Sequence, residues 1–94
     1  MPYLLVRHKV KDYAKWKPVF DEHGATRRTK GSKGARLFRK VDYPNELVIL
    51  FEWDTLARAR EFAGSDELRG AMERAGVADR PDVYYLEEIE RSAG

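Results

Sequence analysis

The feature that most constrains the fold is a pair of short segments that are apolar at every position. Residues 47–51 read Leu-Val-Ile-Leu-Phe, and residues 3–6 read Tyr-Leu-Leu-Val. Because successive side chains of a strand point to opposite sides of a sheet, both segments are predicted to be strands buried on two sides. A chain of 94 residues has few elements with which to cover both faces of one sheet.

The rest of the chain alternates between strand-like and helix-like patterns. Strands are predicted over residues 3–10, 35–41, 47–53 and 83–90. Helical regions are predicted between the first two strands and between the last two, and turn residues at 42–45 join the middle strands as a hairpin. This βαββαβ order predicts one α+β domain over residues 1–94 with a ferredoxin-like fold, in which a four-stranded antiparallel sheet carries its helices on one face.

The helical regions contain their own start and stop signals. Asp12 is the predicted cap of the first region, and Pro18 is expected in its first regular turn, after a looser turn at residues 12–17. Residues 64–66 are expected to break the second region in two, and Gly76 is expected to end it. A stripe of side chains three and four residues apart is predicted to face the core: Tyr13, Trp16, Phe20 and His23.

The predicted fold leaves one face of the sheet bare, although its central strands are apolar on both sides. Since the chain has no spare element, we predict a homodimer in which the bare faces of two subunits stack, a dimeric α+β barrel. The distribution of charge predicts which strands lie at the edges of the sheet: residues 27–40 hold seven basic and no acidic side chains, whereas residues 82–90 hold four acidic and no basic side chains. The second and fourth strands are therefore predicted to be the two sheet edges.

Composition excludes several classes of partner. The net charge of +2 is too balanced for a dedicated polyanion binder, and residues 46–53 lack the basic-Gly-aromatic signature of RNA-recognition domains. The chain has no cysteine, so thiolate metal sites and iron–sulfur clusters are excluded, and its two histidines make only a weak metal site. We expect no metal, no cofactor, no nucleic acid and no membrane as partners, and a cytoplasmic location.

Short strings along the chain carry a family resemblance. They are Val6-Arg7-His8-Lys9-Val10, Asp12-Tyr13 with Trp16 and Phe20, Pro44-Asn45-Glu46 before Leu50-Phe51-Glu52-Trp53-Asp54, Ser65 with Leu68-Arg69, and Ala75-Gly76-Val77. Together they resemble antibiotic biosynthesis monooxygenase-like domains of the dimeric α+β barrel superfamily. This resemblance implies kinship with cofactor-independent oxygenases of polycyclic aromatic substrates, quinol oxygenases and haem-degrading enzymes. An Asn on the first strand, used by the haem-degrading relatives, has no match in residues 3–10, which argues against haem degradation.

His8 is the candidate catalytic residue. It shares strand parity with Leu4, Val6 and Val10, an apolar row, so it is predicted to face an enclosed cavity. Burial without a charge partner is expected to keep its imidazole neutral near pH 7, the form that a general base needs. The alternative is a structural histidine whose hydrogen bonds are satisfied inside the core.

Five further residues are candidate ligand-binding groups. His23 ends the helical stripe. The aromatic residues Phe38, Trp53 and Tyr85 lie on predicted strands and can stack on a flat ligand if their side chains point into the cavity. Arg36 is the one cation among the five. These residues are His23, Arg36, Phe38, Trp53 and Tyr85. For the aromatic residues, the alternative is an ordinary place in the core, and a shift of one residue in strand pairing exchanges the partners of Arg36 and Phe38.

Two functions remain open at this stage. The first is a cofactor-independent monooxygenase-like enzyme that acts on a small aromatic or quinol-type substrate, with His8 as the base; it depends largely on the resemblance. The second is a non-catalytic small-ligand-binding or stress-related dimer. Polar groups that converge on a closed pocket would favour catalysis, whereas a pocket lined by apolar groups alone would favour binding.

Overall fold

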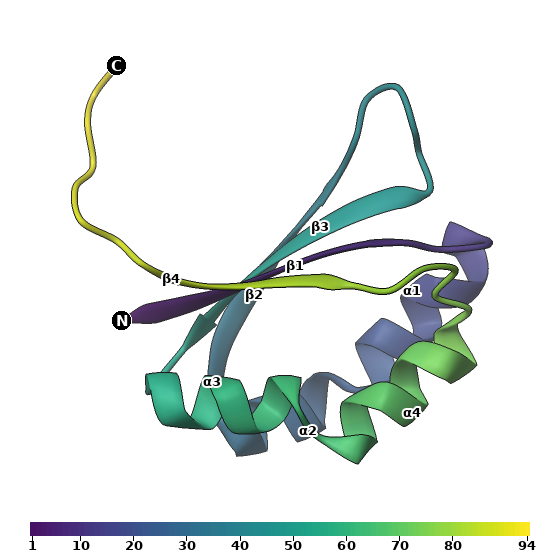
Figure 1. The fold of residues 1–94 in the computed structure, drawn as a ribbon, viewed down its shortest axis with the longest axis horizontal. Helices are drawn as coiled ribbons and strands as arrows, with labels where there is room; N and C mark the ends of the chain where they lie inside the picture. Colours follow the sequence, from purple (N-terminus) through teal and green to yellow (C-terminus); the bar gives the residue numbers. More distant parts are fainter.

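Four strands form one antiparallel sheet, and four helices cover one of its faces. In the computed structural model, which describes residues 1–94, the elements follow in the order β1 (Pro2–Lys9), α1 (Tyr13–Glu22), α2 (Gly24–Lys30), β2 (Ser32–Arg39), β3 (Glu46–Trp53), α3 (Leu56–Ala63), α4 (Asp66–Ala75) and β4 (Asp82–Glu87). The helices lie together on one side of the sheet, and its other side is open (Figure 1). The predicted ferredoxin-like arrangement is confirmed.

The strand order is β2-β3-β1-β4, so β2 and β4 are the sheet edges, as the charge pattern predicts. The acidic edge is shorter than expected, because β4 ends at Glu87 and leaves Glu88 and Glu90 beyond the strand. The basic edge begins earlier than expected, at Ser32, and its pairing with β3 shifts at an irregularity between Ser32 and Gly34.

Strand alternation divides the sheet into a helix-covered face and an open face. Every second residue of β3, from Leu47 to Trp53, is buried, and so is the row of β1 that contains Leu4 and His8. These rows face the helices and form the core with Trp16 and Phe62. The intervening residues are only partly buried in the single chain, because nothing in it covers the open face.

The first helix departs from the prediction at Pro18. Helix α1 runs without interruption from Tyr13 to Glu22 with Pro18 inside it, so the looser turn expected at residues 12–17 is wrong. A proline there removes one backbone hydrogen bond. The helix persists because Trp16 is buried and stacks on Phe20 with ring centroids 4.9 Å apart, and because Asp12 Oδ1 accepts a hydrogen bond from the N–H of Ala14.

The break between α3 and α4 at residues 64–65 and the end of α4 at Gly76 match the sequence signals, whereas the division of the first helical region into α1 and α2 at His23 was not predicted. Thr55 and Ser65 cap α3 and α4 by accepting hydrogen bonds from backbone N–H groups three residues on, and Gly76 ends α4 in the left-handed conformation. Gly31 ends α2 at φ 122°, and a Cβ there would collide with the side chain of Asp54 and lie 2.9 Å from Nε1 of Trp53. Gly31 is therefore the point at which α2 packs against the end of β3.

None of the four helices has the length and apolar content that crossing a membrane requires.

Candidate functional site

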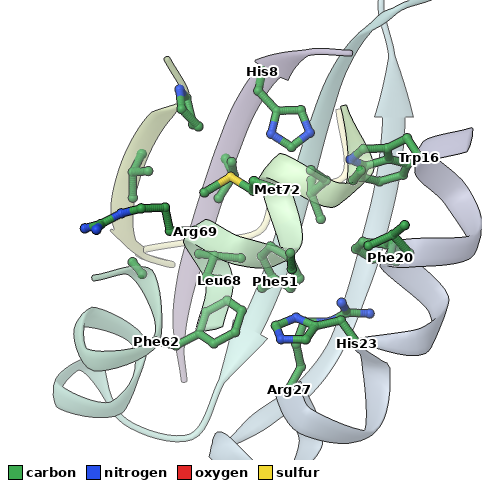
Figure 2. Close-up of a pocket in the computed structure, with 18 of the residues that line it drawn as sticks. His8, Trp16, Phe20, His23, Arg27, Phe51, Phe62, Leu68, Arg69 and Met72 are labelled. Carbon is green, nitrogen blue, oxygen red and sulfur yellow. The ribbon is translucent and has the colours of Figure 1, made fainter. Parts of the chain in front are cut away.

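A cavity of about 460 Å³ lies between the sheet and the helices. Strands β1, β3 and β4 form its floor, helices α1, α3 and α4 form its walls, and α2 closes one end (Figure 2). Of the 19 residues that line it, 13 are hydrophobic. The other six are Pro81, two histidines and three arginines, without a single carboxylate. This composition suits a largely apolar ligand that carries a polar or anionic group.

His8 projects from β1 into this cavity and is only 3% exposed (Figure 2). Its burial, predicted from strand alternation, is confirmed. Both ring nitrogens are buried, and neither has a hydrogen-bond partner in the protein. An unpartnered buried imidazole is costly to a folded chain, so the structural alternative of a satisfied core histidine does not describe it.

The surroundings of His8 keep its imidazole neutral. Burial lowers the pKa of His8 to about 4; the charge of Asp79 acts in the opposite direction, and that of Arg7 lowers it further. Arg7 does not contact the ring, since its guanidinium is committed to the carboxylates of Glu46, Asp79 and Asp82. At pH 7 the imidazole is therefore neutral, and the lone pair of one ring nitrogen is free to accept a proton.

Aromatic rings form the wall beside His8. The ring of Trp16 meets His8 edge to face at a centroid distance of 5.8 Å, and Trp16 stacks in turn between Tyr13 and Phe20. Trp16 and Phe20 line the cavity as a rigid apolar wall. Both faces of the Trp16 ring are covered by Tyr13 and Phe20, so a ligand packs against this wall rather than on a free face of Trp16.

The opposite end of the cavity is basic. His23 and Arg27 lie there together, as Figure 2 shows, with Arg69 at the side of the cavity. His23 has a lowered pKa, mainly because of burial and then because of the positive charge of Arg27. Arg69 and Arg80 are exposed and belong to the rim, whereas Arg27 is a buried residue.

Two of the predicted ligand-binding residues lie on the other side of the sheet. Arg36 pairs with Leu50 and Phe38 with Val48, both on the open face, so neither side chain enters the cavity of His8. Phe38 is 51% exposed there, and Arg36 borders a hollow on the open face next to Tyr3. The parity condition under which Phe38 was expected to stack on a ligand in this cavity is not met.

Trp53 and Tyr85 face the helices, yet neither lines the cavity. Trp53 is completely buried, donates a hydrogen bond from Nε1 to the carbonyl oxygen of Lys30 at 3.2 Å, and packs on Phe62 at 4.7 Å between ring centroids. Tyr85 is 40% exposed under the guanidinium of Arg60. Of the six candidate residues, only His8 and His23 line the cavity, at its opposite ends.

Arg27 was not predicted as a site residue, because it was counted only in the basic stretch of residues 27–40 that marks a sheet edge. A signal was present, because Arg27 follows His23 by four residues and so continues the spacing of the stripe that begins at Tyr13. Arg69 and Arg80 also line the cavity, and their spacing in the sequence gives no comparable indication.

No protein-family model matches the sequence, and no curated protein matches it. Solved structures do. SnoaB from Streptomyces nogalater, a cofactor-independent oxygenase, superposes with a TM-score of 0.79 at 15% identity, covering 99% of this chain and 97% of SnoaB. The chain has the fold of the antibiotic biosynthesis monooxygenase-like proteins.

Two more structures extend this similarity. A candidate antibiotic biosynthesis monooxygenase from Bordetella bronchiseptica gives a TM-score of 0.78 at 16% identity, covering 95% of this chain and 97% of that one. Rv0793 from Mycobacterium tuberculosis gives 0.68 at 14% identity, covering 99% of this chain and 100% of that one. The resemblance seen in the sequence is thereby confirmed for the fold. No group of three or more His, Asp or Glu side chains lies close enough together to hold a metal ion.

Proposed function

We propose that this protein is a cofactor-independent oxygenase that acts on a small aromatic or quinol-type substrate, with His8 as general base. One observation carries the proposal: a neutral imidazole, buried in a ligand-sized cavity, has no partner for either ring nitrogen. The polar groups that converge on the cavity favour catalysis over simple binding. The fold shared with SnoaB, a cofactor-independent oxygenase, is compatible with this function.

The proton step follows from the environment of His8. An aromatic substrate packed against the wall of Trp16 and Phe20 presents a phenolic O–H or an activated C–H to the imidazole. A base whose pKa is about 4 is weak in water, but proton transfer here creates an imidazolium beside an enolate or phenolate. In an apolar cavity, attraction between those charges is much stronger than in water and offsets the weak basicity.

The substrate anion supplies the electrons for the reaction with dioxygen. The deprotonated carbon adds O₂ and gives a hydroperoxide, which loses water to leave a ketone. For a methylene carbon, one oxygen atom enters the product and the other leaves as water together with the two hydrogens. The substrate is oxidised and O₂ is reduced, so this balance requires no external reductant.

The proposed function is tested by oxygen uptake. Purified protein, treated with chelator and free of flavin, is mixed with anthrone or with a substituted hydroquinone in an oxygen electrode. Uptake well above the rate without protein is expected for at least one of these substrate types, in proportion to protein concentration. If neither type is turned over although aromatic ligands bind in calorimetry, the non-catalytic small-ligand-binding or stress-related alternative replaces the enzyme.

We also propose that the chain is a homodimer joined through the open face of the sheet. The centre of that face is apolar and largely uncovered in one subunit, with the side chains of Leu5, Val48, Leu50, Tyr84 and Leu86. The charged edges lie on either side of it. A second copy of the same face buries this surface with self-complementary shape, and rim charges fix its orientation more than its affinity.

Sedimentation of the wild type at micromolar concentration is expected to give twice 10.9 kDa. Leu5→Asp places a carboxylate between Leu50 and Tyr84, with no cation directly opposite it, in each half of the interface. It is expected to weaken association by at least about a hundredfold. Val41→Asp is the matched control, because Val41 is 96% exposed in a loop, and it is expected to remain dimeric. A wild type that sediments as a monomer at both low and high salt contradicts the dimer.

A further inference from the structure

Arg27 is a buried cation without an anion. Its residue is 8% exposed, yet its guanidinium forms no hydrogen bond and no ion pair within the chain. The carboxylate whose charge acts on it most is that of Asp21, which is already bound to Lys17 at 2.7 Å. Burial lowers the pKa of Arg27 to about 10, so the group still carries its full charge at neutral pH.

The guanidinium of Arg27 is held in place by aromatic rings. It lies 3.9 Å from the ring centroid of Phe20 and 5.7 Å from that of Phe51, and all three residues line the cavity. This cation–π contact leaves the N–H donors of the guanidinium unused, so they remain available to an oxygen anion. The residue is buried, but its guanidinium nitrogen atoms are not fully enclosed, so water is their partner in the free protein and a bound anion would replace that water.

We propose that the cavity binds a planar aromatic anion, whose carboxylate or phenolate oxygen is held by Arg27 while its ring lies along the wall of Trp16 and Phe20. This inference rests on the proposed function in one respect: it takes the same cavity as the substrate site. It adds the class of substrate and the group that selects it. The absence of carboxylates from the cavity lining removes the competitor that would otherwise occupy the guanidinium.

The two ends of the cavity set the shape of this ligand. His8 pairs with Leu47 across the sheet, and Phe51, which contacts Arg27, lies four residues further along β3. At about 3.3 Å per residue, these levels are separated by about 13 Å along the strand. A molecule that reaches both His8 and Arg27 is therefore elongated, as a fused-ring aromatic acid is, with its anionic group remote from the atom that faces His8.

The test compares two probes of nearly equal shape, 2-naphthoate and its uncharged analogue 2-naphthamide, by isothermal titration calorimetry. The wild type is expected to bind the naphthoate at least about tenfold more tightly than the amide, because hydrogen bonds to a charged group are the stronger kind. Arg27→Met keeps an apolar stem in contact with Phe20 and is expected to abolish this preference while leaving amide binding within about threefold. Arg28→Met, a neighbouring exposed arginine on α2, is the matched control and is expected to behave as the wild type.

A second measurement does not depend on the variant. In wild-type protein labelled with ¹⁵N-arginine, the Nε–H resonance of Arg27 is expected to shift with naphthoate and not with naphthamide. Equal affinity of the wild type for the two probes, no binding of either, a parallel loss of both in Arg27→Met, or an unmoved resonance would overturn the proposal. None of these measurements requires turnover. A failure of the anion preference can therefore be distinguished from a failure of the proposed oxygenase function.

Discussion

Replacement of His8 by glutamine is expected to lower kcat for oxygen uptake by a factor of about 10²–10⁴, the contribution typical of a positioned general base. Glutamine approximates the size and polarity of the imidazole but cannot take up a proton near neutral pH. Substrate affinity should change far less, because the apolar and aromatic walls of the cavity stay intact. The measurement is steady-state oxygen uptake with the substrate that gives turnover in the wild type.

His23→Gln is the matched control for this experiment, because His23 lines the same cavity at its opposite end. It also removes an imidazole, but from a position remote from His8, so kcat is expected to fall by less than about tenfold. Normal turnover in His8→Gln, or equal losses in the two variants, would remove His8 from the role of base.

The pH profile gives an independent check on His8. Since burial lowers its pKa to about 4, the imidazole of the free enzyme is neutral from pH 7 down to about pH 5 and becomes protonated only as the pH falls through about 4. The acid limb of kcat/KM is therefore expected near pH 4, well below the value of about 6.5 for an exposed histidine. Circular dichroism at each pH separates this limb from acid unfolding.

The sequence predicts the helix-covered face of the sheet well, because the periodicity of side chains along strands and helices determines which residues face it. Once residues 3–10 form a strand, alternation places His8 with Leu4 and Val6, and the helical stripe of Trp16 and Phe20 supplies the opposing layer. Two-fold periodicity on a strand and a period of 3.6 on a helix are properties of the backbone, so they survive even where the ends of an element shift by a residue or two.

The rest of the site depends on geometry that the sequence does not encode locally. The faces occupied by Arg36 and Phe38 follow from the pairing of β2 with β3, which includes an irregularity near Ser32 that alters the register. Arg27 belongs to the site only because α1 and α2 meet at His23, where His23 ends one helix and precedes the next. The basic stretch of residues 27–40, predicted from its charge to mark a sheet edge, thus contributes one residue to the cavity.

Trp53→Ala is expected to lower the free energy of unfolding by about 3–5 kcal/mol, the loss typical of a large aromatic side chain in a packed core. Trp53 is fully buried between Phe51 and Phe62, and its Nε1 donates to the carbonyl oxygen of Lys30. The side chain thereby joins the end of β3 to the end of α2, next to Gly31. Urea unfolding followed by circular dichroism measures the change.

Two further variants show which part of the Trp53 side chain matters. Trp53→Phe keeps an aromatic ring but removes the N–H donor, and it is expected to lose only about 1–2 kcal/mol. Tyr85→Ala removes an exposed aromatic from the same face of the sheet and is expected to cost less than about 1 kcal/mol. The contrary result is a Trp53→Ala variant that unfolds at the same urea concentration as the wild type and loses affinity for aromatic ligands. Because removal of a packed core side chain lowers stability, that result would make Trp53 a wall of the binding site, as predicted from the sequence, and not a core residue.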